Sequence, residues 1–228
     1  MVDKELIRLE LKDRVASIVL DSPPENRMTR HFFRRLHEVL TWIESLDIGA
    51  LMILSSGRHF SAGADVEDIK MRIIEPYIEG TDFEEVLKQT IQRDCALLSK
   101  IESLPYPVIG VMNGLCIGSG LELALACDIR ICSTDCIVGS PEFSWGLFPG
   151  CNGTVRLERL LGRSKALEFI MMGDMINSQR ALSMGLVNRV VDRRNLTFEA
   201  MKLAQFLAEK SREDTNIQTK KSVLKVCR

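Results

Sequence analysis

Three nearly continuous apolar segments constrain the fold of this chain more than any other feature. They are Val15–Leu20, Ala50–Leu54 and Val108–Met112, and each has the length of a buried strand. A strand with one wet face alternates apolar and polar side chains, so these runs indicate a sheet that is covered on both faces. Segments with helical spacing alternate with the runs, which predicts an α/β fold.

Local signals place further elements around these strands. Ile7–Leu11 is expected to form a hairpin with the first apolar run, and Thr29 is expected to cap the helix that follows. Thr81 and Glu84 have the spacing of a capping box, which predicts the start of a long helix that runs towards Ser103. A further strand is predicted over Leu186–Val191.

Composition excludes several classes of protein. The 228 residues carry 30 Lys and Arg against 31 Asp and Glu, a net charge of −1, which argues against a nucleic-acid binder. Leu104–Leu121 is 18 residues without a charge, but its prolines and glycines indicate strands and turns rather than a membrane span. The seven cysteines include no CxxC pair, so free thiols and a cytoplasmic location are expected.

The glycine-rich turn Gly118–Glu122 follows a predicted strand and opens a predicted helix. A dinucleotide fingerprint fails because Leu123 occupies the third glycine position. A nucleophile elbow at Cys116 would need a histidine further along the chain. The histidines all precede it and lack the spacing of metal ligands: His31, His37 and His59. A buried structural thiol is therefore the favoured interpretation of Cys116.

The same turn has the geometry of half an oxyanion hole. A helix that begins near Ser119 leaves its first N–H groups without partners, and its dipole favours negative charge there. The loop Arg58–Asp65 is a second junction between a strand and a helix, so donors from two loops could converge on one oxygen. An ordinary tight turn is the competing interpretation of either loop.

Two glutamates lie in apolar surroundings, unlike most acidic residues of the chain. Glu122 follows the glycine-rich turn, and Glu142 follows Pro141. A carboxylate in such surroundings tends to have a raised pKa, which suits general acid–base catalysis. Helix capping by Glu122 and a loop hydrogen bond to Glu142 explain the two positions equally well at this point.

An ordered set of motifs resembles the enoyl-CoA hydratase/isomerase (crotonase) superfamily from about Val15 to Val223. The segments that carry the resemblance are Ser61–Asp65, Asn113-Gly114, Gly118–Glu122, Ala126–Asp128, Pro141-Glu142, Gly146–Gly150, Gly162–Ala166, Gly173-Asp174 and Ala181–Val187. The resemblance implies a spiral of ββα units with a helical C-terminal region. It implies a core domain over residues 1–195, a C-terminal helical segment over 196–228, and assembly as a homotrimer or a dimer of trimers.

The resemblance also implies the site. The backbone N–H groups of Ala62 and Ser119 are expected to hold a thioester carbonyl, and Glu122 and Glu142 are expected to be catalytic. Substrate-binding residues are expected in two short segments: Ala62, Gly63, Ala64, Asp65 and Gly118. No metal site is expected, and coenzyme A is expected only as part of the substrate.

The expected reaction is the addition of water to a 2-trans-enoyl-CoA, with both glutamates as the acid–base pair. The alternatives are a Δ3-Δ2 enoyl-CoA isomerase, which needs a single carboxylate, and a non-catalytic protein that binds acyl-CoA. The only partner expected is an acyl-CoA thioester, with no nucleic acid and no membrane.

The chain departs from the family pattern in three places. Asp21–Asn26 is one residue shorter than usual, so charge for coenzyme A is expected from Arg27, Arg30 or Lys70. Cys151-Asn152-Gly153 replaces a turn richer in glycine, where Asn tolerates left-handed backbone. The cover over the acyl pocket is expected to be short or absent, because the sequence stops at residue 228.

Overall fold

The computed structural model of the protein describes residues 6–78, 80, 82–146, 148–211 and 215–226. Its larger sheet has the order β1-β2-β3-β4-β6-β9, in which β1 is antiparallel to β2 and the other pairings are parallel. The six strands are β1 (Ile7–Lys12), β2 (Val15–Leu20), β3 (Ala50–Ser55), β4 (Val108–Met112), β6 (Ile129–Ser133) and β9 (Arg189–Val191). A smaller sheet of order β5-β7-β8 contains β5 (Leu115–Ile117), β7 (Ile137–Gly139) and β8 (Met175–Asn177).

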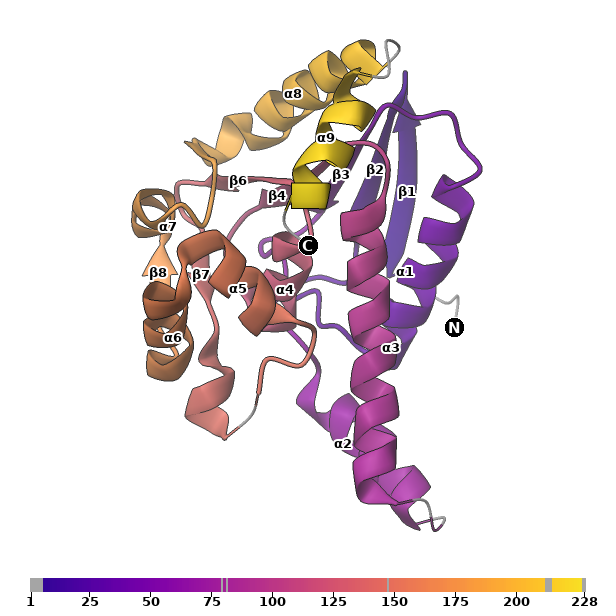
Figure 1. Ribbon diagram of the computed structural model, residues 1–228, viewed down its shortest axis with the longest axis vertical. Coiled ribbons are helices and arrows are strands. Elements are labelled where there is room, and N and C mark those ends of the chain that lie inside the picture. The colour runs from indigo at the N-terminus through magenta and orange to yellow at the C-terminus, as the bar shows by residue number, and fades with distance from the viewer. Residues whose placement is uncertain (1–5, 79, 81, 147, 212–214, 227–228) are drawn as a thin grey trace.

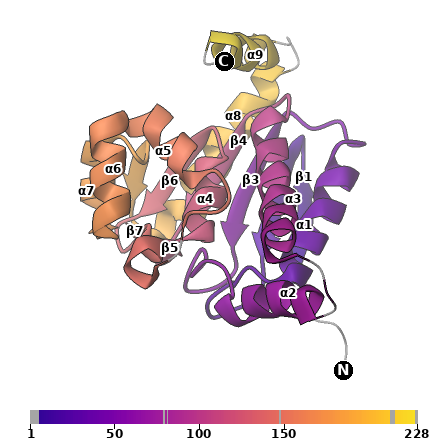
Figure 2. The same ribbon diagram turned by 60° about the horizontal axis from the view of Figure 1, so that its bottom comes forward.

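Helices surround the two sheets. Their bounds are α1 (Arg30–Ile43), α2 (Val66–Ile78), α3 (Phe83–Ser103), α4 (Ser119–Leu125), α5 (Gly153–Leu161), α6 (Arg163–Met172), α7 (Ser178–Met184), α8 (Leu196–Lys210) and α9 (Thr215–Val226), with short 3-10 turns η1 (Pro141–Trp145) and η2 (Arg193–Asn195). In Figure 1, α2 and the first turns of α3 lie at one end of the molecule, and α8 lies at the other. Figure 2 shows α5, α6 and α7 on one side of the strands and α1, α2 and α3 on the other.

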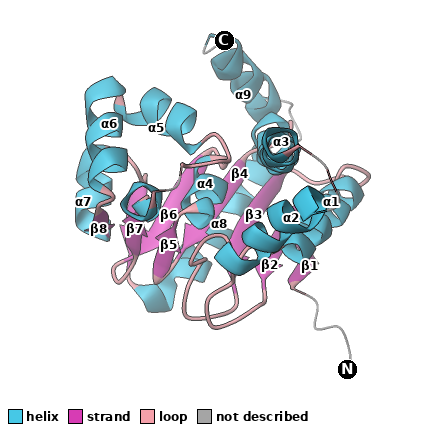
Figure 3. Ribbon diagram, turned by 90° about the horizontal axis from the view of Figure 1, so that it is seen from below, coloured by secondary structure: helices cyan, strands magenta, loops and turns pink. Residues whose placement is uncertain are grey.

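The larger sheet is buried on both faces, as the apolar runs predict. On β3, Leu51 and Ile53 belong to the core that contains residues of α1, α3 and α4. Ala50 and Met52, which alternate with them, pack with the buried alanines of α8 on the opposite face. Figure 3 shows the strands as a layer between these helices. Both faces therefore require apolar side chains, which explains why the runs are continuous.

Most predicted elements are confirmed, and the differences have local causes. Thr29 caps α1 by accepting a hydrogen bond from the Phe32 N–H at 3.2 Å. The N-cap of α3 is Asp82, whose side chain accepts a hydrogen bond from the Glu85 N–H at 3.1 Å. The helix is therefore confirmed, but the capping residue predicted for it is wrong. Thr81 lies outside the described residues. The strand predicted over Leu186–Val191 is shorter in the structure, where it is limited to β9. The sequence analysis does not predict β5 and β8, because these strands have too few residues to show a periodic pattern.

The uncharged segment 104–121 is divided between β4, β5 and the start of α4. Within the part of the chain that the structure describes, no helix is long and apolar enough to cross a membrane. Helix α8 packs on β3, β4 and β6, so residues 196–210 share the packing of the large sheet. The division of the chain at residue 195 stays a prediction.

Gly49 allows α8 to lie close to the sheet. A Cβ atom at residue 49 would lie 2.7 Å from both the Cα and the carbonyl oxygen of Ala208. We expect Gly49→Ala to lower the free energy of unfolding by roughly 1–3 kcal/mol, because the backbone of α8 must shift. Urea denaturation measures the change. Gly150→Ala is the matched control, since its Cβ would have no neighbour nearer than 3.8 Å. Equal losses in both variants would contradict the packing argument.

Candidate active site

Two loops that leave the carboxyl ends of β3 and β4 are joined by backbone hydrogen bonds. The Phe60 N–H donates to the Asn113 carbonyl at 2.7 Å, and the Ser61 N–H donates to the Leu115 carbonyl at 3.0 Å. The Ile117 N–H donates back to the Ser61 carbonyl at 3.1 Å. These bonds hold the segment 62–65 beside the start of α4. In parallel α/β sheets, ligands bind at this carboxyl edge.

Close approach of the two loops depends on glycine. A Cβ at Gly120 would lie 2.7 Å from the Cβ of Ser61, so no side chain fits there. Gly63 has φ of +89°, and its Cβ would lie 3.0 Å from the carbonyl oxygen of Ile117. The two junctions that the sequence singled out therefore form one unit.

The hydrogen bonds of these loops show which N–H groups a ligand could use. The Ala62 N–H donates to the Glu25 carbonyl at 2.8 Å, so it is occupied within the protein. The structure therefore does not support Ala62 as an oxyanion donor, and it corrects that expectation. The N–H groups of Ala64 and Ser119 make no hydrogen bond to another described residue. The free donor of the first loop thus lies two residues later than expected.

Buried polar side chains support the first loop, a role that sequence reasoning did not assign to them. The side chain of Asn26 accepts from the Ser22 N–H at 2.8 Å and donates to the His59 carbonyl at 2.9 Å. The side chain of Asn113 donates to the carbonyls of Gly57 and Arg58 at 2.9 and 3.0 Å. Asn26 has a positive φ of 46°, a left-handed backbone conformation that Asn adopts more readily than most residues.

Cys116 has a structural role. The residue is fully buried and forms an isolated parallel bridge with Ser61 across the two loops. Burial raises the pKa of its thiol well above the ordinary value, so the thiolate needed for nucleophilic attack is disfavoured. The structure therefore agrees with the interpretation of Cys116 as a buried structural thiol.

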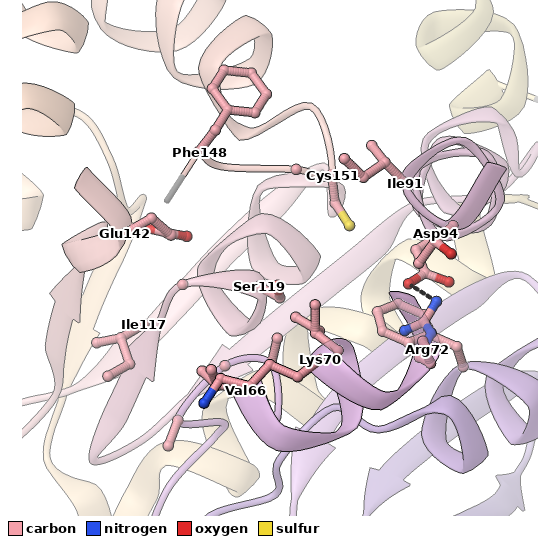
Figure 4. A pocket seen from close by; sticks show the side chains of 18 of the residues that line it. Val66, Lys70, Arg72, Ile91, Asp94, Ile117, Ser119, Glu142, Phe148 and Cys151 are labelled. Carbon is pink, nitrogen blue, oxygen red and sulfur yellow. Dashed lines mark hydrogen bonds and ion pairs between the residues drawn. The ribbon is translucent and has the colours of Figure 1, made fainter. Parts of the chain in front are cut away.

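A cavity of about 320 Å³ lies beside the paired loops. Most of the expected site residues line it: Ala62, Gly63, Ala64, Gly118, Ser119 and Glu142. Lys70 also lines it, and Figure 4 shows Glu142, Ser119 and Lys70 around the open space. Asp65 is not on the wall. Its carboxylate accepts a hydrogen bond from the Asp68 N–H at 3.0 Å, at the start of α2.

Glu122 lies behind the cavity wall rather than on it. Its side chain is buried, and Oε1 accepts from the N–H groups of Cys151 and Gly153 at 2.7 and 2.9 Å. Its carboxylate therefore holds the start of α5 and does not cap its own helix. Asn152, between these donors, has φ of 64°, the left-handed backbone that Asn was expected to tolerate.

The electrostatic environment of Glu122 favours a bound proton. Burial, and next the negative charge of Glu142, raise the pKa of Glu122 to about 7, although the N–H groups of Gly153 and Cys151 oppose the shift. Its Oε2 is buried and has no hydrogen-bond partner within the described chain. A carboxyl group with a pKa near neutrality can both take up and release a proton at physiological pH.

Glu142 faces the cavity from η1. Its Oε2 accepts a hydrogen bond from the Ser140 hydroxyl at 2.8 Å. Its Oε1 lies 3.4 Å from the position that a Cβ on Gly118 would occupy, so the carboxylate is adjacent to the glycine-rich turn. The structure thus brings both glutamates to the same turn, one on the cavity wall and one behind it. Their catalytic role stays a prediction.

Outside residues 1–5, 79, 81, 147, 212–214 and 227–228, the chain contains no group of three or more His, Cys, Asp or Glu side chains that could hold a metal ion. The cysteines at positions 95, 116, 127, 132, 136 and 151 are free thiols.

Comparison with known proteins gives consistent matches. The family model for enoyl-CoA hydratase/isomerase matches residues 10–226. A probable enoyl-CoA hydratase of Bacillus subtilis is 36% identical over 207 residues, which cover 90% of this chain and 77% of that protein. The alpha subunit of the fatty acid oxidation complex of Shewanella frigidimarina is 37% identical, over 85% of this chain but only 27% of the subunit. The crystal structure of an enoyl-CoA hydratase from Bacillus anthracis superposes with a TM-score of 0.78 at 30% identity, covering 89% of this chain and 76% of that one.

The raised pKa of Glu122 predicts how the free energy of unfolding changes with pH. An unfolded glutamate loses its proton near pH 4.5, whereas the folded protein keeps this proton up to about pH 7. Between these values the folded state binds the extra proton, so stability falls as the pH rises, by at most about 1.4 kcal/mol per pH unit. Urea unfolding from pH 5 to 7.5 measures this slope.

Glu122→Gln cannot titrate, so this part of the slope should disappear in that variant. Glu158→Gln, at an exposed position on α5, is the control and should keep the slope of the wild type. A wild-type slope that persists unchanged in Glu122→Gln would contradict the raised pKa.

Proposed function

Since the chain belongs to the enoyl-CoA hydratase/isomerase family, we propose that it adds water across the double bond of a 2-trans-enoyl-CoA. Members of this family act on acyl-CoA thioesters and share the crotonase fold. One arrangement carries the proposal. Two backbone N–H groups, those of Ala64 and Ser119, have no acceptor among the described residues and lie on the same cavity wall as Glu142.

In this proposal the N–H groups of Ala64 and Ser119 donate to the thioester carbonyl oxygen. They withdraw electron density from the conjugated double bond, so the β-carbon becomes electrophilic. Negative charge that develops on the oxygen is stabilised by both donors and by the positive end of the α4 dipole. Coenzyme A takes part only as a portion of the substrate, and Lys70 is a candidate to approach its phosphates.

The two glutamates then share the proton transfers. The pair carries one proton, and in its reactive form this proton is on Glu142 while Glu122 is ionised. As the water oxygen bonds to the β-carbon, a proton of the water passes to the Glu122 carboxylate, and Glu142 gives its proton to the α-carbon of the enolate. Glu122 ends protonated and Glu142 ends ionised, so one proton returns within the pair before the next turnover. The pKa of about 7 for Glu122 supports this exchange, because two coupled carboxyls titrate as a pair.

One observation favours a second candidate, the Δ3-Δ2 enoyl-CoA isomerase. Glu142 lines the cavity, whereas Glu122 does not. A single carboxylate on the wall is sufficient to remove a proton from the α-carbon of a 3-enoyl-CoA and return it to the γ-carbon. The isomerase needs no water beside Glu122, so the two reactions differ in their dependence on that residue.

We also propose that the protein assembles as a homotrimer or a dimer of trimers. Large apolar side chains are exposed on neighbouring elements at one side of the molecule: Phe143 of η1, Leu167, Met171 and Met172 of α6, and Met175 of β8. Exposed apolar patches of this kind mark protein interfaces. The free cysteines support a reducing compartment, and we propose the cytoplasm.

Crotonyl-CoA tests the proposed reaction directly. We expect the absorbance of its conjugated double bond to fall when the wild-type protein is added. Glu122→Gln and Glu142→Gln should each lower kcat by about 10²–10⁴-fold, since each removes a proton carrier. Glu158→Gln, on α5, is the control for an exposed carboxyl and should retain the wild-type rate.

The outcomes distinguish the candidates. Hydration that survives both substitutions contradicts the two-glutamate mechanism. Conversion of a 3-enoyl-CoA without hydration, with loss in Glu142→Gln and retention in Glu122→Gln, selects the isomerase. Binding of acyl-CoA without either reaction selects the non-catalytic alternative.

Light scattering after size-exclusion chromatography tests the assembly. We expect three or six times the mass of one chain, and a smaller species when Met171 and Met172 are both replaced by Glu. Leu11→Glu, at a similarly exposed position on β1, should leave the assembly intact. A wild-type monomer contradicts the proposal.

A further inference from the structure

The imidazole of His59 takes part in the backbone pairing of the two loops. The bonds from the Ser61 N–H to the Leu115 carbonyl and from the Ile117 N–H to the Ser61 carbonyl form one step of a parallel ladder. The preceding step of a regular ladder would bring the Leu115 N–H to the carbonyl of His59. That carbonyl accepts a hydrogen bond from the side chain of Asn26 at 2.9 Å. The Leu115 N–H donates instead to Nδ1 of His59, at 3.0 Å.

The turn after β4 leaves space for this ring. Gly114 has φ of +55°, and a Cβ at this position would lie 2.6 Å from Nδ1 of His59. Any other residue at position 114 would therefore displace the imidazole. The Asn113 side chain donates to the Arg58 carbonyl at 3.0 Å, so the residue before His59 is also held. The backbone around the ring thus fits an imidazole that accepts from Leu115.

The bond fixes the protonation state of the ring. A backbone N–H can only donate, so Nδ1 of His59 accepts with its lone pair, and the neutral ring carries its proton on Nε2. An imidazolium carries a proton on both nitrogens, and its Nδ1–H would then face the Leu115 N–H. Uptake of a proton by His59 is therefore incompatible with this hydrogen bond.

The groups around the ring keep it neutral near physiological pH. Burial, and next the positive charges of Arg58 and Arg193, lower the pKa of His59 below its ordinary value. Arg193 comes from η2, and its Nη2 donates to the Arg58 carbonyl at 3.0 Å. The carboxylates of Glu25, after β2, and Asp135, after β6, oppose the shift with smaller effects. The acceptor form of the ring therefore prevails at neutral pH and is lost in acid.

We propose that neutral His59 is a positioning residue for the two donors of the thioester carbonyl, an inference that rests on the proposed function. Its bond to Leu115 fixes the start of β5, which leads through Gly118 to the N–H of Ser119. On the other loop, His59 precedes the segment that carries the N–H of Ala64. A proton on the ring breaks the bond and loosens the pairing that brings both donors to one oxygen.

Hydrogen exchange measures the pairing without any substrate. H59N keeps an acceptor, Oδ1, at the position of Nδ1 but cannot titrate, whereas H59L fills similar space without an acceptor. At pH 7.5 we expect the amides of residues 113–119 to exchange about tenfold faster in H59L and unchanged in H59N. H37L is the matched control, at an exposed position on α1, and should exchange like the wild type. Equal exchange in H59L and the wild type overturns the proposal.

Acid supplies a second test, which does not require H59L to fold. The wild type and H59N are compared from pH 7.5 to 4.5, so the intrinsic change of exchange rate with pH is the same in both proteins. We expect residues 113–119 to exchange progressively faster in the wild type than in H59N as the ring takes up a proton. A ratio that stays constant over this range overturns the proposal, because asparagine has no proton to gain.

Turnover of crotonyl-CoA separates this inference from the proposed reaction. At pH 7.5 we expect kcat/KM to fall by about 10–100-fold in H59L and to be retained in H59N, because displaced donors stabilise the oxyanion poorly. The ratio of kcat/KM between the wild type and H59N cancels the titration of the glutamates, and this ratio should fall in acid. Exchange that depends on His59 without hydration supports its role in the pairing and contradicts the hydratase. Hydration with equal kcat/KM in H59L and the wild type supports the hydratase and contradicts the positioning role.

Discussion

The backbone pairing of residues 60–61 with 113–117 is the contact on which the whole site depends. It joins the loops after β3 and β4 into one unit, so the free N–H of Ala64 and that of Ser119 come to one cavity. Each bond alone is worth only about 1 kcal/mol. Their effect is geometric, because donors that are held in place need no reorganisation when charge develops on a bound oxygen.

Glu122 connects this unit to the second half of the molecule. Its carboxylate accepts two N–H bonds from the turn before α5, and Gly153 leaves no room for a side chain there, since a Cβ would lie 2.8 Å from Oε1. Burial of a carboxyl is unfavourable for its charged form, which raises the pKa. One residue thus positions α5 and carries an exchangeable proton, so structural and catalytic interpretations of Glu122 are compatible.

Sequence reasoning succeeded where the signal was local and failed where it depended on distant partners. Apolar runs predicted the central strands, and Thr29 predicted its helix cap, because periodicity and capping act within a few residues. The cap of α3 was missed because Asp82 is also a capping residue, and it accepts from the Glu85 N–H, so the helix begins one residue later than the predicted box implies. The family resemblance placed a donor at Ala62, and no local pattern shows that the Glu25 carbonyl occupies its N–H.

The amino-acid sequence alone predicts an α/β sheet covered on both faces, a glycine-rich turn at the start of a helix, and two glutamates in apolar surroundings. Those properties follow from side-chain type and spacing. Tertiary packing is needed to show which N–H groups have no acceptor among the described residues, which glutamate faces the cavity, and that Arg72 meets Asp94 across two helices. Hydrogen-bond occupancy and burial are properties of groups brought together from distant parts of the chain, so spacing along the sequence does not reveal them.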